Sequence, residues 1–558
     1  MSTLTTDPIH SGSSNPKLSV VVAVISMLHE RADVNSATRS FRGEPVLSWT
    51  LKRLCSSERL GNVTILCWED QLEAVEEIAE EHHAYVMSKA PRQRVALIDA
   101  VAAARRWADG WRGGLLSTCD FDLGFHPAWA LEVCERLEGD AIVLIDPSAG
   151  LIDPKLVDRV IDRACDKSHV ELCFTQAAPG LAGALIRKPL LERLATAQAH
   201  AGRLLHYMPD QPQRDPIGTD ACVPVATLVA RTVHSFRLDS ERQIRRVALA
   251  SIGLNGTLAD SDAEEIAQRF DWPSKSDELP RELKIELNTT RRSAPIFWPG
   301  KHLKIERGVT SLETWAKLLN ESAAGADDLR LTIGGVGDPI ESELLFPVID
   351  AAKRAGINAI QVQTDLLSDD LHAVERLADS MIDVVAVNLP AITEATYATV
   401  MGVDRFRHVL QNIAHFFRRR HERHSGVPLL VPVFTKLGHN LAEMEVWYDQ
   451  WLRTLGNAVI VGPSSYAGQI EDLRVADMSP PTRRACRQLS SKMTVLCDGS
   501  IVACDQDVMG KNVVGRIGEM SLADLWNGQL ARIRSAHEQG KWDAHLLCAG
   551  CREWHRAA

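Results

Sequence analysis

The residues that most clearly suggest chemistry are the cysteines near the carboxyl end of the chain. The sequence has 558 residues and 12 cysteines, and no cysteine lies between residues 223 and 485. Five occur in the last 73 residues, namely Cys486, Cys497, Cys504, Cys548 and Cys551. Thiolates are ligands of structural zinc and of iron–sulfur clusters. This uneven distribution predicts a metal site in the carboxyl-terminal segment.

The elements around these cysteines would bring four of them together. Two apolar runs, MTVLC and SIVAC, flank Asp498-Gly499, a pair typical of a hairpin turn. A predicted helix, SLADLWNGQLARIRSAHEQG, then returns the chain to a C-x2-C pair. So small an α+β module has little core, which makes a metal a natural stabiliser. Spacing alone fits one [4Fe–4S] cluster or one tetrahedral zinc ion. The predicted ligands are Cys486, Cys504, Cys548 and Cys551.

The same segment resembles the SPASM/twitch extension of radical S-adenosylmethionine enzymes. That extension opens with a cysteine, a spaced glycine and a second cysteine, a pattern met here by Cys486, Gly499 and Cys504. Further along the chain, GRIGEMSLADLWN resembles the GNI…L…W stretch of the same family. The resemblance implies a [4Fe–4S] cluster rather than zinc. It implies a single cluster, because no cysteine follows Cys551. Cys497 is expected in a strand, and His555 is a spare donor.

A second candidate site lies between residues 283 and 480, where strand and helix patterns alternate. KIELNTT, LRLTIGG, INAIQVQT, DVVAVNL and VPLLVPVF are typical of strands, and helical segments separate them. This alternation predicts a full or partial (β/α) barrel of the TIM type, with its site at the carboxyl ends of the strands. There Gly335, Gly337 and Asp338 would form a tight turn with exposed N–H groups and a carboxylate. The alternative is a β-to-α turn that needs glycine for its geometry.

This region resembles a radical S-adenosylmethionine barrel. IELNTT, GGVGDPI, VQTDLLSDD and VAVNLPAITEATYATVMGVDRFRHVLQNI follow one another as in that family. The resemblance implies that Asp338 would meet the amino group of S-adenosylmethionine. The family's C-x3-C-x2-C motif, however, is replaced by Arg291, Pro295 and Trp298, which cannot ligate iron. We therefore expect no radical-generating cluster, weak S-adenosylmethionine binding at most, and Trp298 in the vacated volume. Arg291 and Arg292 would place two cations at the mouth.

A third set of candidates is acidic and lies in residues 18–250. Strand patterns such as GDAIVLID alternate with helical ones, which predicts an α/β domain with a mostly parallel sheet. Ligands of such sheets sit at the carboxyl ends of the strands, where Asp146 falls. Asp120 and Asp122 are further candidate metal ligands. The alternative is that Asp146 and Asp239 are loop and turn carboxylates.

Residues 18–250 resemble the nucleotidyltransferases that activate sugars, especially the cytidylyltransferase-like group linked to surface polysaccharides. The resemblance rests on GEPVLSWTLKRL, IDPSAGLIDP and FRLDSERQIRRV. It implies a three-layer α/β fold in which Asp146 holds a magnesium–nucleotide complex and Asp239 assists. The family's Gly-rich loop and its lysine are missing, because no Gly lies between Lys17 and Gly43 and no Lys between Lys17 and Lys52. We expect that nucleotidyl transfer has been lost.

Bulk properties limit the class of protein. The net charge of −11 argues against general nucleic-acid binding. No segment approaches about 18 consecutive apolar residues, so we expect no membrane span and a cytoplasmic location. The predicted segments are a disordered tail (1–17), a nucleotidyltransferase-like domain (18–250), a linker with a short helix (251–282), a barrel (283–480) and the cysteine-rich module (481–558).

The three regions together resemble fusion proteins of the spiro-SPASM kind. Our leading interpretation is an iron–sulfur protein with a degenerate radical S-adenosylmethionine barrel, associated with sugar or surface-polysaccharide modification. A small-molecule or sugar-nucleotide ligand would fit that role. One alternative is an active, magnesium-dependent sugar nucleotidyltransferase. Another is a non-catalytic, zinc-stapled scaffold for a partner enzyme. No catalytic residue is assigned, and the sequence leaves open whether the protein is an enzyme.

Overall fold

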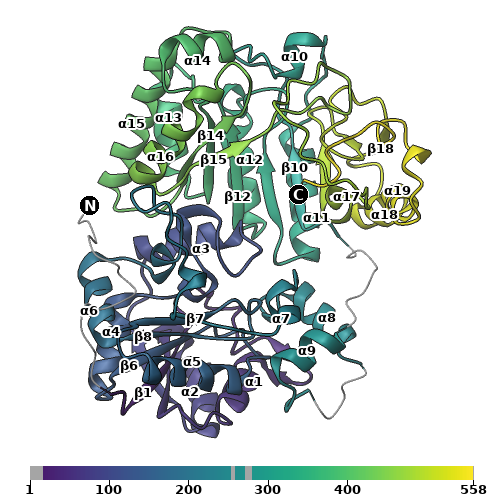
Figure 1. Ribbon diagram of the computed structural model, residues 1–558. Helices are drawn as coiled ribbons and strands as arrows, with labels where there is room; N and C mark the ends of the chain where they lie inside the picture. The colour runs from purple at the N-terminus through teal and green to yellow at the C-terminus, as the bar shows by residue number, and fades with distance from the viewer. Residues whose placement is uncertain (1–16, 253–257, 271–278, 557–558) are drawn as a thin grey trace. The chain divides into compact units, whose positions relative to one another are not determined.

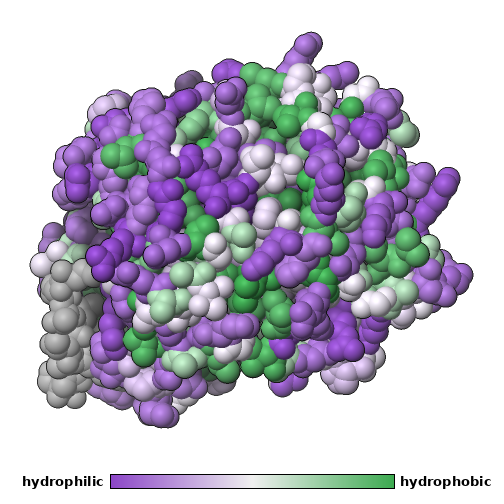
Figure 2. All heavy atoms as spheres, turned by 90° about the horizontal axis from the view of Figure 1, so that it is seen from above, coloured by the Kyte–Doolittle hydropathy of each residue, from purple (hydrophilic) through white to green (hydrophobic). Residues whose placement is uncertain are grey.

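A computed structural model describes residues 17–252, 258–270 and 279–556 (Figure 1). The chain divides into two compact units, Met1–Pro273 and Ser274–Ala558. The tail predicted for residues 1–17 lies, apart from Lys17, outside the described residues. Within the described ranges, every helix is too short or too polar to traverse a lipid bilayer. Figure 2 shows a face that is mostly hydrophilic, with hydrophobic residues in small areas between the polar ones.

The first unit is built on a seven-stranded sheet in the order β5-β4-β1-β6-β8-β7-β9. Its strands are β1 (Val21–Ser26), β4 (Asn62–Trp68), β5 (Tyr85–Lys89), β6 (Ala141–Ile145), β7 (Leu172–Thr175), β8 (Ala184–Arg187) and β9 (Cys222–Val223). β1 pairs in parallel with β4 and β6, and β4 with β5, whereas β8 runs antiparallel to β6 and β7. A separate ribbon joins β2 (Ser40–Phe41) and β3 (Glu44–Pro45). The predicted mostly parallel sheet is confirmed.

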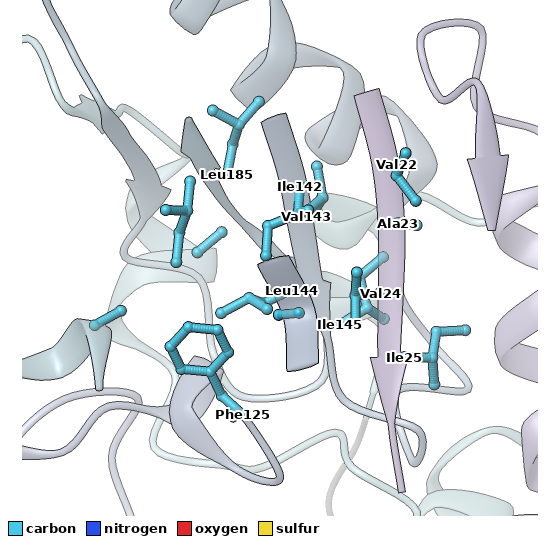
Figure 3. Close-up of a cluster of buried hydrophobic side chains, with 14 of the residues drawn as sticks. Val22, Ala23, Val24, Ile25, Phe125, Ile142, Val143, Leu144, Ile145 and Leu185 are labelled. Atoms are coloured by element: carbon cyan, nitrogen blue, oxygen red, sulfur yellow. The ribbon is translucent and has the colours of Figure 1, made fainter. Parts of the chain in front are cut away.

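The helices of the first unit are α1 (Val46–Leu54), α2 (Leu72–Glu81), α3 (Ala96–Arg106), α4 (Pro127–Arg136), α5 (Pro154–Asp166), α6 (Lys188–Ala197), α7 (Thr227–Arg231), α8 (Glu241–Ala250) and α9 (Ala263–Arg269). Among them α2, α4, α5 and α6 pack on the strands and make the outer layers of a three-layer arrangement (Figure 1). Strands covered on both faces are expected to be apolar throughout, and β1 and β6 are fully buried. Figure 3 shows their side chains packed with Leu185 and Phe125.

Part of the predicted linker belongs to this first unit. Ile266 of α9 and the neighbouring Phe270 lie in its hydrophobic core. The buried guanidinium of Arg53 donates hydrogen bonds to the carbonyls of Leu258 and Ala259, at 2.8 and 2.6 Å. The segment 258–270 is therefore packed on the first unit, and the short helix predicted in this region is α9. The rest of the predicted linker lies partly outside the described residues.

The second unit is built on a nine-stranded sheet in the order β15-β14-β13-β12-β11-β10-β16-β17-β18. The strands are β10 (Glu282–Ile285), β11 (Arg330–Ile333), β12 (Ala359–Thr364), β13 (Val384–Asn388), β14 (Leu429–Thr435), β15 (Val459–Val461), β16 (Lys492–Val495), β17 (Ser500–Val502) and β18 (Val513–Arg516). Strands β10 to β15 are all parallel and follow chain order. Because β15 and β18 are the two edges of the sheet, the barrel is partial and open.

The helices of the second unit alternate with these strands. They are α10 (Pro299–His302), α11 (Leu312–Gly325), α12 (Leu345–Arg354), α13 (Leu371–Asp379), α14 (Glu394–Met401), α15 (Phe406–Glu422), α16 (Met444–Leu455), α17 (Arg487–Ser491), α18 (Leu522–Asn527) and α19 (Gln529–Glu538). One face of the sheet packs on a large core, to which β10 contributes Leu283 and Ile285. The alternate residues Glu282 and Lys284 therefore lie on the opposite face. The barrel interior is polar on this side.

The cysteine-rich segment is not a separate module with a core of its own. Strand β16 pairs in parallel with β10, and β17 and β18 extend the same sheet in antiparallel fashion. Met493, Val495 and Ile501 belong to the same hydrophobic core as the barrel strands. The carboxyl-terminal segment is therefore supported by barrel packing as well as by any metal.

Candidate metal centre

The four predicted ligand cysteines lie in one part of the second unit. Burial raises the pKa of the Cys504 thiol well above its usual range, and Asp505, Cys486 and Cys548 raise it further. Burial also raises the pKa of Cys548 to about 12, with Cys551 and Cys486 adding to the effect. The four sulfurs are thus close enough to repel one another as thiolates.

The arrangement of these sulfurs differs from that of a compact single-ion site. Among the described residues, no three histidine, cysteine, aspartate or glutamate side chains form a group that could hold one metal ion. All four cysteines are free, and the sulfurs form no disulfide. The assignment of these residues as ligands of one cluster therefore stays a prediction, supported by the surroundings of each sulfur.

Backbone N–H groups lower the pKa of two of the thiols, against the effect of burial. Cys486 precedes α17, and the N–H groups of Gln488 and Leu489 lower the pKa of its thiol, against burial, which raises it. The N–H of Gln506 acts in the same way on Cys504. Hydrogen bonds of this kind stabilise a thiolate, which is the form that binds a metal.

The other two sulfurs also have hydrogen-bonding partners. The N–H of Glu553 donates to Cys551 Sγ at 3.3 Å. The ring nitrogen Nδ1 of His545 lies 3.6 Å from Cys548 Sγ. Sulfur is large, so 3.6 Å is a normal hydrogen-bonding separation between a ring nitrogen and a thiol sulfur. Sequence reasoning singled out His555 and missed His545, whose position three residues before a C-x2-C pair was the available signal. All four thiols therefore fit a polynuclear iron–sulfur cluster, whose properties depend on hydrogen bonds to sulfur.

A hairpin positions Cys504. Thr494 pairs with Val502 and Val495 with Ile501, so the turn spans residues 496–499. Gly499 has a φ of +83°, which other residues rarely adopt. The predicted hairpin is present, but its turn is longer than the Asp-Gly pair alone.

This longer turn corrects the prediction for Cys497. It lies in the turn after β16 and not in a strand. It is fully buried, and its carbonyl accepts a 2.7 Å hydrogen bond from the Thr310 N–H. Its own N–H lies 3.4 Å from Glu286 Oε1. Cys497 therefore anchors the turn to the barrel instead of pairing in the ladder.

Two buried ion pairs join β10 and the segment after it to the metal-binding segment. Lys284 Nζ lies 3.0 Å from Asp505 Oδ2. Glu286 pairs with Arg307 at 2.6 Å, and Arg307 also donates to the Val508 carbonyl at 2.6 Å. Sequence reasoning missed both pairs. The charged residues alternating with apolar ones in ELKIELN were the available signal, because they indicate a polar inner face.

In the barrel, the Gly335–Pro339 loop is closely packed. Asp338 is 2% exposed, and its carboxylate accepts from the N–H groups of Ile340 and Asp365, at 3.2 and 2.9 Å. A Cβ at Gly335 would lie 2.8 Å from the Glu286 side chain, and one at Gly337 would overlap Asn288. The geometry thus supports the alternative that these glycines serve the turn.

The residues at the expected cluster positions fill the mouth of the barrel. Arg291 Nε lies 3.4 Å from Asp365 Oδ2, and its guanidinium lies 5.7 Å from the centre of the Trp298 ring. The indole N–H of Trp298 donates to the Val336 carbonyl at 2.6 Å. Arg292 pairs with Glu341 at 2.8 Å and with Asp369. Both arginines are therefore paired with carboxylates of the same chain.

In the first unit, Asp120, Asp146 and Asp239 meet around one arginine. Arg237 Nη1 lies 3.0 Å from Asp120 Oδ1 and 3.7 Å from Asp146 Oδ2, and its Nη2 lies 2.8 Å from Asp239 Oδ2. Burial raises the pKa of Asp120 and of Asp146, and the guanidinium opposes that rise. Asp146 follows β6 beside β1, where the chain leaves the two strands in opposite directions. The sequence analysis used the segment FRLDSERQIRRV for the family resemblance only. It did not predict that Arg237 of this segment pairs with the three aspartates.

Asp122 does not join this cluster. Its Oδ2 lies 3.1 Å from Nδ1 of His200 and accepts the Cys119 N–H at 2.8 Å. The N–H of Gly202 donates to Oδ1 at 3.0 Å. These partners hold two loops together. Asp120 and Asp122 are thus separated in function, and they do not form a two-aspartate metal motif.

Several known proteins are similar to part of this chain. An uncharacterized protein of Treponema pallidum (strain Nichols) is 28% identical over 175 residues, 30% of this chain and 46% of that protein. The chain is similar to BtrN in complex with AdoMet and 2-DOIA (TM-score 0.33, 16% identity, 49% of this chain and 92% of that one). It is also similar to Streptococcus suis SuiB bound to precursor peptide SuiA (0.38, 14%, 50% and 73%).

A further solved structure similar to this chain is a cytidylyltransferase from Leptospira borgpetersenii serovar Hardjo-bovis (strain JB197), with a TM-score of 0.33, 14% identity and coverage of 46% of this chain and 99% of that one. The match that covers the cysteines is to a family model. Residues 486–552 match SPASM, an iron-sulfur cluster-binding domain. This span begins at Cys486 and contains all four candidate ligands. The carboxyl-terminal segment of this chain is therefore a SPASM domain.

Proposed function

We propose that the protein is an iron–sulfur protein in which Cys486, Cys504, Cys548 and Cys551 hold one [4Fe–4S] cluster. The observation that carries this proposal is that residues 486–552, which contain all four cysteines, match an iron-sulfur cluster-binding domain. Hydrogen-bonding contacts at the sulfurs of Cys548 and Cys551 support it. When bound, a cluster of this kind stores or transfers one electron.

We further propose that the barrel generates no radical. A radical-generating cluster needs thiolates beside the first strand, and the sequence has no cysteine between residues 223 and 485. Arg291 and Trp298 contact each other and their own carboxylate and carbonyl partners. Asp338, which resemblance assigns to the amine of S-adenosylmethionine, is buried and hydrogen-bonded within the chain. The barrel acts as a scaffold or a ligand-binding remnant.

The association with sugar or surface-polysaccharide modification is the least direct part of the proposal. It rests on the resemblance of residues 18–250 to sugar nucleotidyltransferases. The alternative of an active transferase needs Asp146 and Asp239 to hold a magnesium–nucleotide complex. Both carboxylates are engaged by Arg237, which disfavours that alternative. A small molecule or sugar nucleotide is the proposed ligand class, and a partner enzyme would supply any catalysis.

Anaerobic purification followed by iron, sulfide and zinc analysis tests the proposed function. We expect about four irons and four sulfides per chain. A variant with serine at all four cysteines should lose both. Cys497→Ser is the matched control, because Cys497 lies in the same segment but faces Glu286. Zinc without iron in iron-replete protein would support the zinc-stapled alternative and contradict the cluster.

A further inference from the structure

Two of the candidate ligands differ in the kind of group that contacts their sulfur. A main-chain N–H, that of Glu553, donates to Cys551 Sγ at 3.3 Å. Cys548 Sγ instead meets the imidazole of His545, with Nδ1 at 3.6 Å. A substitution keeps the main-chain N–H at its position, whereas it removes the imidazole. The contact with Cys548 Sγ can therefore be tested by changing His545 alone.

We propose that His545 is a positioning residue that donates a hydrogen bond to Cys548 Sγ and raises the reduction potential of the cluster bound there. This inference rests on the proposed function, since it requires the four cysteines to hold a redox-active cluster. His545 is not a ligand in this assignment. It acts through the sulfur of Cys548.

The local backbone fixes the ring beside the sulfur. The N–H of Cys548 donates to the His545 carbonyl at 3.0 Å, and the N–H of Cys551 donates to the Cys548 carbonyl at 3.2 Å. These two consecutive turns place the imidazole and the C-x2-C pair on one short stretch of chain. Arg483 clamps the same stretch by donating to the carbonyls of Cys548 and Ala549, at 2.5 and 3.1 Å. These hydrogen bonds fix the backbone that carries both His545 and Cys548, and so they keep the imidazole next to Sγ.

The sign of the effect follows from charge. Reduction adds an electron to the cluster and increases the negative charge on its thiolate sulfurs. A hydrogen bond to sulfur stabilises that charge, so it favours the reduced state and raises the potential. Removal of the donor should lower the potential without removing a ligand.

Three variants separate this role from a general structural one. His545→Leu removes the donor, and His545→Asn keeps an N–H near the position of Nδ1. His439→Leu makes the same change at an exposed histidine of the second unit. Each protein is purified anaerobically as the full chain, analysed for iron and sulfide, and titrated with dithionite and redox mediators while its visible and electron paramagnetic resonance spectra are followed. Far-ultraviolet circular dichroism checks that all variants fold.

We expect unchanged iron and sulfide content in all three variants. The midpoint potential should fall in His545→Leu, recover at least partly in His545→Asn, and stay at the wild-type value in His439→Leu. In protein labelled with ¹⁵N-histidine, pulsed spectroscopy of the reduced cluster should detect one weakly coupled nitrogen that disappears in His545→Leu.

Each opposing result has a separate meaning. Equal potentials in wild type and His545→Leu, with clusters present in both, would overturn the role of His545 alone. A strongly coupled nitrogen, or loss of iron in His545→Leu with the fold intact, would overturn it in favour of direct ligation. A wild-type protein without iron would overturn the proposed function together with this inference.

Discussion

Lys284 and Asp505 form a largely buried ion pair, with Nζ and Oδ2 3.0 Å apart and about one sixth of each side chain exposed (17% and 18%). Lys284 belongs to the first strand of the barrel, and Asp505 directly follows the candidate ligand Cys504. The pair therefore joins the polar face of the barrel to the metal-binding segment. Replacing one partner of such a pair by an apolar residue leaves the charge of the other partner uncompensated.

Lys284→Met should destabilise the protein by roughly 3 kcal/mol, because Asp505 would be left buried without its cation. Chemical unfolding followed by circular dichroism measures this loss. Asp505→Leu in the same chain should restore part of it, since no unpaired charge remains. Lys304→Met is the control: Lys304 pairs with Glu306 at the surface, with 82% and 76% of their side chains exposed, and its loss should cost less than about 1 kcal/mol. Equal losses in the two single variants would contradict the importance of the buried pair.

Gly337→Ala should destabilise the second unit by about 2 kcal/mol, because the added Cβ would overlap Asn288. Gly308→Ala should be nearly neutral, since nothing lies within 4 Å of a Cβ at that position. Thermal unfolding of the two variants gives the comparison. If Gly337→Ala proved as stable as wild type, the close packing of this loop would be contradicted.

The contribution of Asp338 to the stability of the protein should fall as the pH rises from about 4 to about 6. Burial raises the pKa of this carboxyl from 3.8 to about 6, with Asp365 adding to the rise and Arg291 opposing it. The unfolded chain therefore loses this proton first as the pH rises. The stabilising contribution is complete below the unfolded pKa and is lost as the pH passes through the folded pKa.

Asp338→Asn should flatten this part of the curve of unfolding free energy against pH. Asp350→Asn, a change at an exposed residue of α12, should leave the curve unaltered. Unfolding by urea at a series of pH values supplies both curves. An unchanged slope in Asp338→Asn would show that this carboxyl titrates normally in the fold.

Arg237→Met should destabilise the first unit by about 3 kcal/mol, because Asp120, Asp146 and Asp239 would lose their shared cation. Mg²⁺ or Mn²⁺ should restore part of the loss in the variant and have little effect on wild type. The midpoint of thermal unfolding with and without each ion measures this. Arg245→Met, an exposed change in α8, is the control. Tight binding of cytidine triphosphate and Mg²⁺ to the wild-type protein, measured by calorimetry, would contradict the view that Arg237 occupies the carboxylates that a metal would need.

Reductive cleavage of S-adenosylmethionine should be absent. That reaction needs an iron with an open coordination position at the barrel mouth, where Arg291, Pro295 and Trp298 stand in place of cysteines. The assay is reconstituted protein with dithionite and S-adenosylmethionine, analysed by chromatography. More 5′-deoxyadenosine than the variant lacking all four carboxyl-terminal cysteines produces would refute the prediction, and it would imply an open iron in the SPASM domain.

The long parallel strands could be predicted from the sequence, because strands covered by helices on both faces appear as continuous apolar runs. β1 and β6 are of this kind. β9, with only two residues, leaves no such pattern. The exact start of α11 is another feature that the sequence leaves open: Ser311, and not the adjacent Thr310, accepts the hydrogen bond that caps the helix. Neighbouring hydroxyl residues offer competing caps, and only the folded backbone selects one.

The candidate ligands could be selected from the sequence because cysteine spacing is local. The residues that surround them could not, since Lys284 and Asp505 are 221 positions apart and meet only when β16 lies beside β10. Arg237 was overlooked for a related reason. A single arginine between Phe236 and Leu238 gives no sign in the sequence that it meets Asp120 and Asp146, which lie about a hundred positions earlier, as well as the nearby Asp239.

The pairing of β16 with β10 also has a consequence for synthesis on the ribosome. β10 gains one neighbour when β11 is made, but its other edge is completed only by residues 492–495, about two hundred positions later. Until then the nascent barrel presents an unpaired strand edge, which is a site for association with other chains. A chain halted before residue 492 should therefore aggregate or be held by chaperones, whereas the first unit, already complete, should be able to fold while translation continues.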